Sequence, residues 1–146
     1  MKRVVIGIGN PNFKDDAVGL KVAEKFEGIV DTVMLFNIGF NLIDCLLGYE
    51  KAIIVDGVKT GREPGSIIEF DVNFWGNVYA SGTHNFSIFE IIRIGYSVFP
   101  EEMPKDIKII GIEVQDVDTL SRQCSPSVES AIPKAVSIIK NYLGIN

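Results

Sequence analysis

Short apolar runs alternate with helical patterns through the first part of this 146-residue chain. The runs at 2–8, 33–38 and 51–57 are rich in β-branched residues, which is typical of buried strands. The third run, KAIIVDG, is apolar on both faces, as strands in the middle of a parallel sheet are. Hydrophobic residues recur at helical spacing in 18–26 and 42–47. The alternation predicts an α/β fold.

The regularity breaks after Asp56. Only about ten residues, KTGREPG among them, separate Asp56 from the next expected strand, whereas a parallel crossover needs a dozen or more. We therefore expect that strand to run antiparallel to its predecessor. The remaining elements expected are this strand at 65–72, a loop at 73–82, a helix at 86–94, a last strand at 108–114, and an amphipathic helix at 128–143 with a kink or boundary at Pro133.

These elements predict one domain, 1–146, built as a three-layer α/β/α sandwich around a mixed, mostly parallel five-stranded sheet. The arrangement is of the phosphorylase/hydrolase-like kind, with one antiparallel strand. The composition, 47% hydrophobic and 23% charged, is that of a globular protein.

Charge and cysteine usage exclude several classes of protein. The net charge of -5 gives no footprint for nucleic acid, which needs clustered Lys and Arg. Cys45 and Cys124 are far apart, so neither a disulfide framework nor a zinc site is indicated and a cytoplasmic location is expected. The longest apolar window, 33–48, is interrupted by polar residues and is shorter than the roughly 20 residues of a membrane span. We expect no membrane segment and a monomer.

Three titratable residues are placed where ligands bind in open α/β sheets, outside the carboxyl ends of the strands. Asp16 follows the first strand, Asp56 ends the third, and His84, the sole histidine, precedes a helix. If the second and third strands lie on opposite sides of the first, Asp16 and Asp56 face each other across the switch point. Two carboxylates and an imidazole suit a divalent metal and leave positions open for substrate.

Each of these residues also has a purely structural interpretation. Asp15 and Asp16 open a helix and could cap its N–H groups. Asp56 could shape a turn, and His84 could be a cap or a surface residue. Cys124 could be a nucleophile, although no motif pairs it with a base, while Cys45 lies among leucines and is expected in the core.

The loop GIGNPNFKDDAVG resembles a dinucleotide fingerprint only in part. Asn12 takes the place of the third glycine, and Asp15 and Asp16 would repel phosphates, so no organic cofactor is expected. We expect Gly7 and Gly9 to let the chain turn off the first strand and deliver Asp16 to the edge of the sheet.

Four segments together resemble the hydrogenase maturation endopeptidases, in the same order and at similar spacing across nearly the whole chain. They are GIGNPNFKDDAVG, IIVDGVKTGREPGSI, THNFS and CSPSVESAIPKAVSIIKNYL. The three metal-contacting positions of that family fall on Asp16, Asp56 and His84. The resemblance thus implies the same three residues as catalytic and metal-binding groups.

The function implied is that of an aspartyl-type endopeptidase. Such enzymes remove a C-terminal extension from the large-subunit precursor of a nickel-iron hydrogenase after nickel insertion. The nickel would be supplied by the precursor, so that only a loaded substrate is cut. Either a carboxylate acting as general base or a metal-polarised group would activate the water.

The chain departs from the family after the second strand, where NIGFNLID replaces a common G-T or G-G-T turn, which bears on substrate selection. Gly57 also stands where alanine is common. Two other functions are compatible with the sequence. One is a chaperone that binds nickel and the precursor without cutting, and the other is a peptidyl-tRNA hydrolase, whose histidine after GIGNP is missing here.

Overall fold

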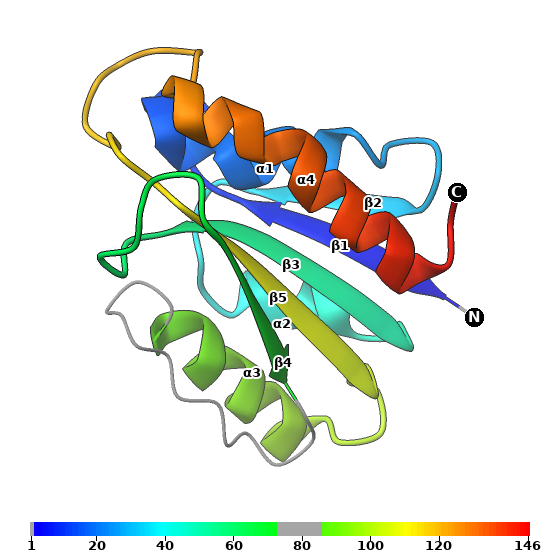
Figure 1. The fold of residues 1–146 in the computed structure, drawn as a ribbon. Coiled ribbons are helices and arrows are strands. Elements are labelled where there is room, and N and C mark those ends of the chain that lie inside the picture. The colour runs from blue at the N-terminus through cyan, green and yellow to red at the C-terminus, as the bar shows by residue number, and fades with distance from the viewer. Residues whose placement is uncertain (1, 73–85) are drawn as a thin grey trace.

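The computed structural model describes residues 2–72 and 86–146. Its five strands form one sheet in the order β2-β1-β3-β5-β4, with helices on both faces (Figure 1), which confirms the predicted fold class. The expected loop at 73–82 lies outside the described residues. The strands are β1 (Arg3–Ile8), β2 (Asp31–Leu35), β3 (Lys51–Val58), β4 (Ile67–Val72) and β5 (Asp106–Glu113); the helices are η1 (Lys14–Ala17), α1 (Val18–Glu24), α2 (Asn41–Leu46), α3 (Phe86–Val98) and α4 (Pro126–Leu143).

Strand β1 lies between β2 and β3 and is parallel to both, as the switch-point argument assumed. Strand β4 runs antiparallel, as predicted, but it pairs with β5 and not with β3. Strand β5 lies between β3 and β4 and is parallel to β3. The short 58–67 connection therefore spans the width of β5, which is feasible because an antiparallel strand needs no return crossover.

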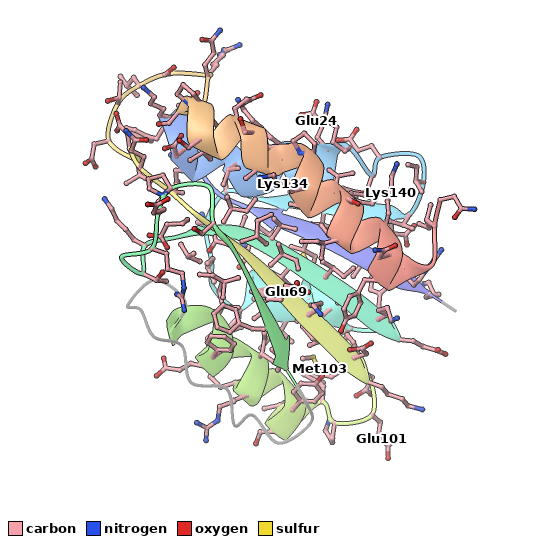
Figure 2. The ribbon with its side chains drawn as sticks, viewed as in Figure 1. Glu24, Glu69, Glu101, Met103, Lys134 and Lys140 are labelled. Carbon is pink, nitrogen blue, oxygen red and sulfur yellow. The ribbon has the colours of Figure 1, made fainter. Side chains whose placement is uncertain are left out.

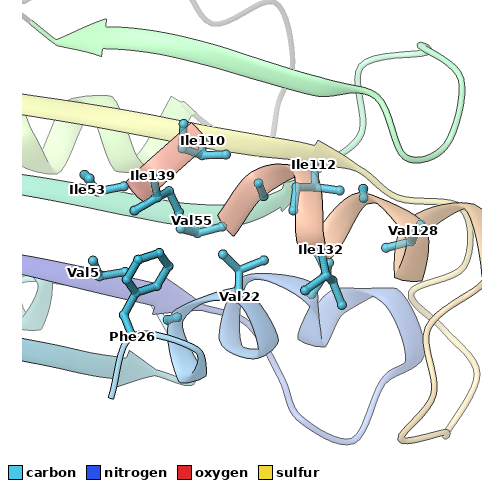
Figure 3. Packing of buried hydrophobic residues seen from close by; sticks show 14 of the residues in the cluster. Val5, Val22, Phe26, Ile53, Val55, Ile110, Ile112, Val128, Ile132 and Ile139 are labelled. Carbon is cyan, nitrogen blue, oxygen red and sulfur yellow. The ribbon is translucent and has the colours of Figure 1, made fainter. Parts of the chain in front are cut away.

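The core is divided between the two faces of the sheet because successive strand residues point in opposite directions. Ile53 and Val55 face α1 and α4, whereas Ile54 faces α2 and α3. Figure 3 shows the hydrophobic cluster on the face covered by α1 and α4, in which Phe26 and Ile139 pack with residues of the strands. On the outer surfaces of α1 and α4, Glu24 and Lys134 project into solvent (Figure 2).

Helix α1 packs directly on the backbone of the sheet. A Cβ on Gly19 would lie 2.4 Å from the carbonyl oxygen of Val55 and 2.6 Å from that of Ile8. A Cβ on Gly7 would lie 2.6 Å from the oxygen of Gly19. Gly7 is thus inside β1 and permits helix contact; the expectation that it forms a turn is wrong.

Several element boundaries differ by a few residues from the sequence prediction, and two differences affect the structure around them. Helix α4 continues through Pro133, so the expected boundary there is wrong. Pro133 is exposed, which leaves the carbonyl group that loses its N–H partner on the solvent side of the helix. The second strand ends at Leu35, so Phe36, Asn37 and Ile38 leave the sheet.

Within residues 2–72 and 86–146, no helix is both long and apolar enough to cross a bilayer.

We expect Gly19→Ala to lower the free energy of unfolding by about 3 kcal/mol, since its methyl group would collide with two backbone carbonyls. Urea denaturation measures this change. Gly39→Ala is the matched control, because its nearest neighbour is the Asn41 side chain at 3.5 Å. Equal stability of the two variants would contradict the close packing of α1.

Candidate functional site

A cleft opens at the carboxyl edge of the sheet where β1 and β3 lie side by side. Its volume is about 320 Å³, and both Asp16 and Asp56 line it. The structure therefore brings together two of the three residues selected from the sequence, and the third, His84, lies outside the described residues. The complete lining is Ile8, Gly9, Asp16, Phe36, Asn37, Ile38, Asp56, Gly57, Val58, Lys59, Val114 and Val117.

Asp56 is a buried carboxyl group inside β3, at 7% exposure. The strand continues to Val58, so Asp56 does not shape a turn. Burial raises the pKa of Asp56 well above its ordinary value, and the negative charge of Asp16 raises it further, while the Gly57 N–H acts in the opposite direction. The group is thus poised to take up a proton or to accept a cation.

Asp16 lies in η1, and its Oδ2 accepts a hydrogen bond from the Asn10 N–H at 2.9 Å. It caps neither η1 nor α1, so the capping interpretation is wrong for this residue. Gly9 makes the close approach of this loop feasible, because a Cβ there would lie 2.0 Å from the Asp16 carbonyl oxygen. The loop after β1 therefore places Asp16 at the cleft.

Asp15 points the other way, into the protein, and is fully buried. Its Oδ2 accepts hydrogen bonds from the N–H groups of Gln115 and Asp116, both at 2.9 Å. Its two oxygens also bind Ser125, Oδ1 the N–H at 2.6 Å and Oδ2 the hydroxyl at 2.8 Å. Burial alone would raise the pKa of Asp15, but these donors outweigh it and lower that pKa. Asp15 also caps no helix; it fastens the 115–125 segment.

Further contacts join the 115–125 segment to the loop that carries Asp16. The N–H of Lys14 binds the Thr119 carbonyl at 3.1 Å, and Asp15 N–H binds the Asp116 carbonyl at 2.9 Å. Phe13 and Leu120 form an antiparallel bridge. The two loops consequently form one wall of the cleft as a unit.

Glu113 anchors a second wall and was not selected from the sequence. It is 2% exposed and accepts hydrogen bonds from the Thr60 N–H at 2.9 Å, the Thr60 hydroxyl at 2.5 Å and the Gly61 N–H at 3.3 Å. These bonds fix the backbone after Lys59, the one cationic residue among those that line the cleft. The sequence does show an acidic residue at the end of a buried strand, and this could have drawn attention to Glu113. It does not show that Thr60 and Gly61 are the hydrogen-bond donors.

The cysteines do not provide a nucleophile. Burial raises the pKa of Cys124 to about 11, and its thiol donates to the Lys14 carbonyl at 3.6 Å, so it stays protonated at neutral pH. Cys45 packs partly buried against the core cluster beneath α2, as expected, and burial raises its pKa too.

In the described ranges, no three His, Cys, Asp or Glu side chains gather closely enough to hold a metal ion by themselves. The cleft instead offers two oxygen-ligand groups, Asp16 and Asp56. Carboxylates are suitable ligands for divalent metals. A complete site needs at least one further donor, from elsewhere in the chain or from a bound partner.

The fold and the cleft define a three-layer α/β protein with two carboxyl groups at the carboxyl edge of its sheet, and comparison with known proteins identifies its family. A sequence profile of the hydrogenase maturation protease family matches residues 19–142. The chain belongs to this family, and the enzyme class predicted from the sequence, a peptidase, is thereby confirmed. The matched range includes Asp56 and His84 and begins after Asp16.

Individual proteins are similar along nearly the whole chain. Coenzyme F420 hydrogenase subunit delta of Methanothermobacter thermautotrophicus is 25% identical and covers 98% of this chain and 95% of its own. The [NiFe] hydrogenase maturation protease HybD from Thermococcus kodakarensis has the same fold, with a TM-score of 0.78, 23% identity, and 97% and 99% coverage. The hydrogenase maturating endopeptidase HybD from E. coli follows at 0.76, 21% identity, and 98% and 92% coverage.

We expect Asp56→Asn to raise the free energy of unfolding at neutral pH, because a neutral amide replaces a carboxyl group that is costly to ionise in the folded protein. A raised folded-state pKa lowers wild-type stability as the pH rises from the ordinary carboxyl pKa of 3.8 toward the folded value. The advantage of the variant should therefore grow in urea titrations as the pH rises above the ordinary carboxyl pKa of 3.8. A difference in the free energy of unfolding between variant and wild type that does not change with pH would contradict the raised pKa of Asp56 beside Asp16.

Asp15→Asn should have the opposite effect and destabilise the protein by about 3 kcal/mol at neutral pH, since an amide leaves buried N–H donors facing its own NH₂ group. The pKa of Asp15 is lowered by folding, so this loss should shrink as the pH falls through the carboxyl range. Urea denaturation at neutral pH and at a pH near the ordinary carboxyl pKa of 3.8 measures this loss. An Asp15→Asn protein as stable as the wild type at neutral pH would contradict the role of Asp15 in fastening the 115–125 segment.

Proposed function

We propose that this protein removes the C-terminal extension from the large-subunit precursor of a nickel-iron hydrogenase after nickel has been inserted. Family membership supports a role in hydrogenase maturation. The observation that carries the finer proposal is the pairing of Asp16 with the buried Asp56 in one cleft. Two neighbouring carboxylates repel each other in the free protein, and an incoming cation removes that repulsion.

In this proposal the cation is nickel that the precursor already holds. Asp16, Asp56 and His84 contact it, and carboxylate and imidazole are both ligands that nickel accepts. The precursor retains its own ligands, so the coordination shell is shared between enzyme and substrate. A nickel-free precursor lacks the ion that joins the two proteins and is not cut. The protein acts as a monomer in the cytoplasm and uses no organic cofactor.

Hydrolysis adds water across the peptide bond, so the attacking water loses a proton and the leaving amine gains one. A carboxyl group whose pKa lies above its ordinary value is a better proton acceptor than an exposed one, which suits Asp56 to the first transfer. Polarisation of the carbonyl or the water by the substrate's metal is the alternative route, and it would also lower the pKa of Asp56.

The test is processing of nickel-loaded and nickel-free precursor, followed by mass spectrometry of the large subunit. We expect wild-type protein to shorten only the loaded precursor, because recognition requires the metal. Asp16→Asn, Asp56→Asn and His84→Ala should each reduce the rate by about 100-fold or more, in the range of lost acid–base catalysis. Lys134→Ala, exposed on the outer face of α4, is the control and should leave the rate unchanged.

Wild-type rates in His84→Ala would remove that residue from the site. Binding of the precursor without any shortening by the wild-type protein would instead support a chaperone. Equal cutting of loaded and nickel-free precursor would contradict recognition through the metal.

A further inference from the structure

Two phenylalanines are strongly exposed on the loop between β2 and α2, whose first residues, Phe36, Asn37 and Ile38, line the cleft. Phe36 follows β2 directly and is 63% exposed, and Phe40 precedes α2 and is 68% exposed. Two strongly exposed aromatic side chains on one short loop are unusual unless they bind something. We call Phe36 and Phe40 the aromatic rim.

The loop that carries the aromatic rim is held in place by hydrogen bonds. The Asn41 side chain accepts from the Gly39 N–H at 2.8 Å and donates to the Asn37 carbonyl at 3.2 Å. The N–H groups that open α2 bind the carbonyls of Gly39, at 3.1 Å, and Phe40, at 3.0 Å. The exposure of the two rings is therefore not the result of a loose loop. A pre-ordered surface loses little conformational entropy when it binds.

The aromatic rim reaches the cleft through Phe36, and Phe40 lies on the same loop two residues after Ile38, which also lines the cleft. Phe36 lines the cleft together with Asp16 and Asp56. The N–H of Gly9, in the loop that leads to Asp16, binds the carbonyl of Leu35, adjacent to Phe36, at 3.0 Å. A polypeptide that brings its scissile bond to the carboxylates therefore passes next to Phe36, the part of the rim that lines the cleft.

We propose that the aromatic rim is a substrate-contact surface that takes an apolar side chain of the precursor, from the stretch that flanks the bond to be cut. The inference rests on the proposed function, which makes the substrate a polypeptide. A cleft of about 320 Å³ holds only a few side chains, so the flanking residues must lie on its edge. The carboxylates respond to a cation, whereas the rim selects by apolar contact. In this proposal the carboxylates recognise whether the precursor holds its metal, and the aromatic rim recognises the amino-acid sequence beside the bond to be cut.

The test uses Phe36→Ser, Phe40→Ser and the double variant. Each is assayed for kcat and KM with nickel-loaded precursor, and for Kd with the same precursor. We expect KM and Kd to rise about 10-fold in each single variant and further in the double variant, because buried aromatic contacts dominate interface affinity. The kcat should change by less than about twofold, because the rim contacts bind the substrate and the transition state equally well.

Two sets of controls separate contact from stability. Ile29→Ser removes an apolar side chain that is 49% exposed in the loop before β2. This loop lies at the end of β2 opposite to Phe36, so the change should alter neither KM nor Kd. Phe36→Leu and Phe40→Leu keep an apolar surface and should restore most of the affinity. Thermal melting should be the same for all variants, because the rim side chains are exposed.

The outcomes distinguish this inference from the proposed function. A wild-type protein that cuts the precursor, with unchanged KM and Kd in the double variant, would overturn the rim and leave the function standing. A wild-type protein that binds but does not cut would overturn the function, while a rise of Kd in the rim variants would still support the contact. A wild-type protein that neither binds nor cuts would overturn both.

Discussion

The hydrogen bonds of the buried Asp15 carboxylate hold together two segments that are about a hundred residues apart in the chain, and the cleft depends on them. They join the loop after β1 to the segment between β5 and α4. Because Asp15 points inward to make these bonds, its neighbour Asp16 is directed to the cleft. The two neighbouring aspartates thus take separate places, Asp15 in the protein interior and Asp16 at the cleft. An uncharged residue at position 15 could not satisfy the same set of N–H donors.

Asp56 illustrates the cost of burying one carboxyl group beside another. Its carboxyl group is buried beside the charge of Asp16, which disfavours ionisation. The surrounding structure compensates through two well-packed core clusters on the two faces of the sheet, and through the clamps made by Asp15 and Glu113. Sites that bind or react commonly retain such local instability, because the ligand supplies what the free protein lacks.

The sequence was sufficient for the fold class and for the pairing of Asp16 with Asp56, because apolar runs, helical periodicity and the switch-point rule depend on local pattern and simple topology. It could not assign the partner of β4, since connection length limits direction but not strand order. It also missed the clamps of Asp15 and Glu113, most of whose donors are backbone N–H groups that no residue type reveals. The second strand was predicted to extend to residue 38, and its true end at Leu35 is what frees Phe36 to line the cleft.

We propose that Asp16 and Asp56 form one cation site, and calorimetric titration of the free protein with Cd²⁺ measures this binding. The account predicts a single site whose affinity falls about 10-fold or more in Asp16→Asn and in Asp56→Asn, since even outer-shell partners of metal ligands contribute on that scale. The two losses should be less than additive in the double variant, because either change breaks the same site. Asp44→Asn, an exposed carboxylate on α2, should bind as the wild type does. Unchanged affinity in both cleft variants would contradict the account.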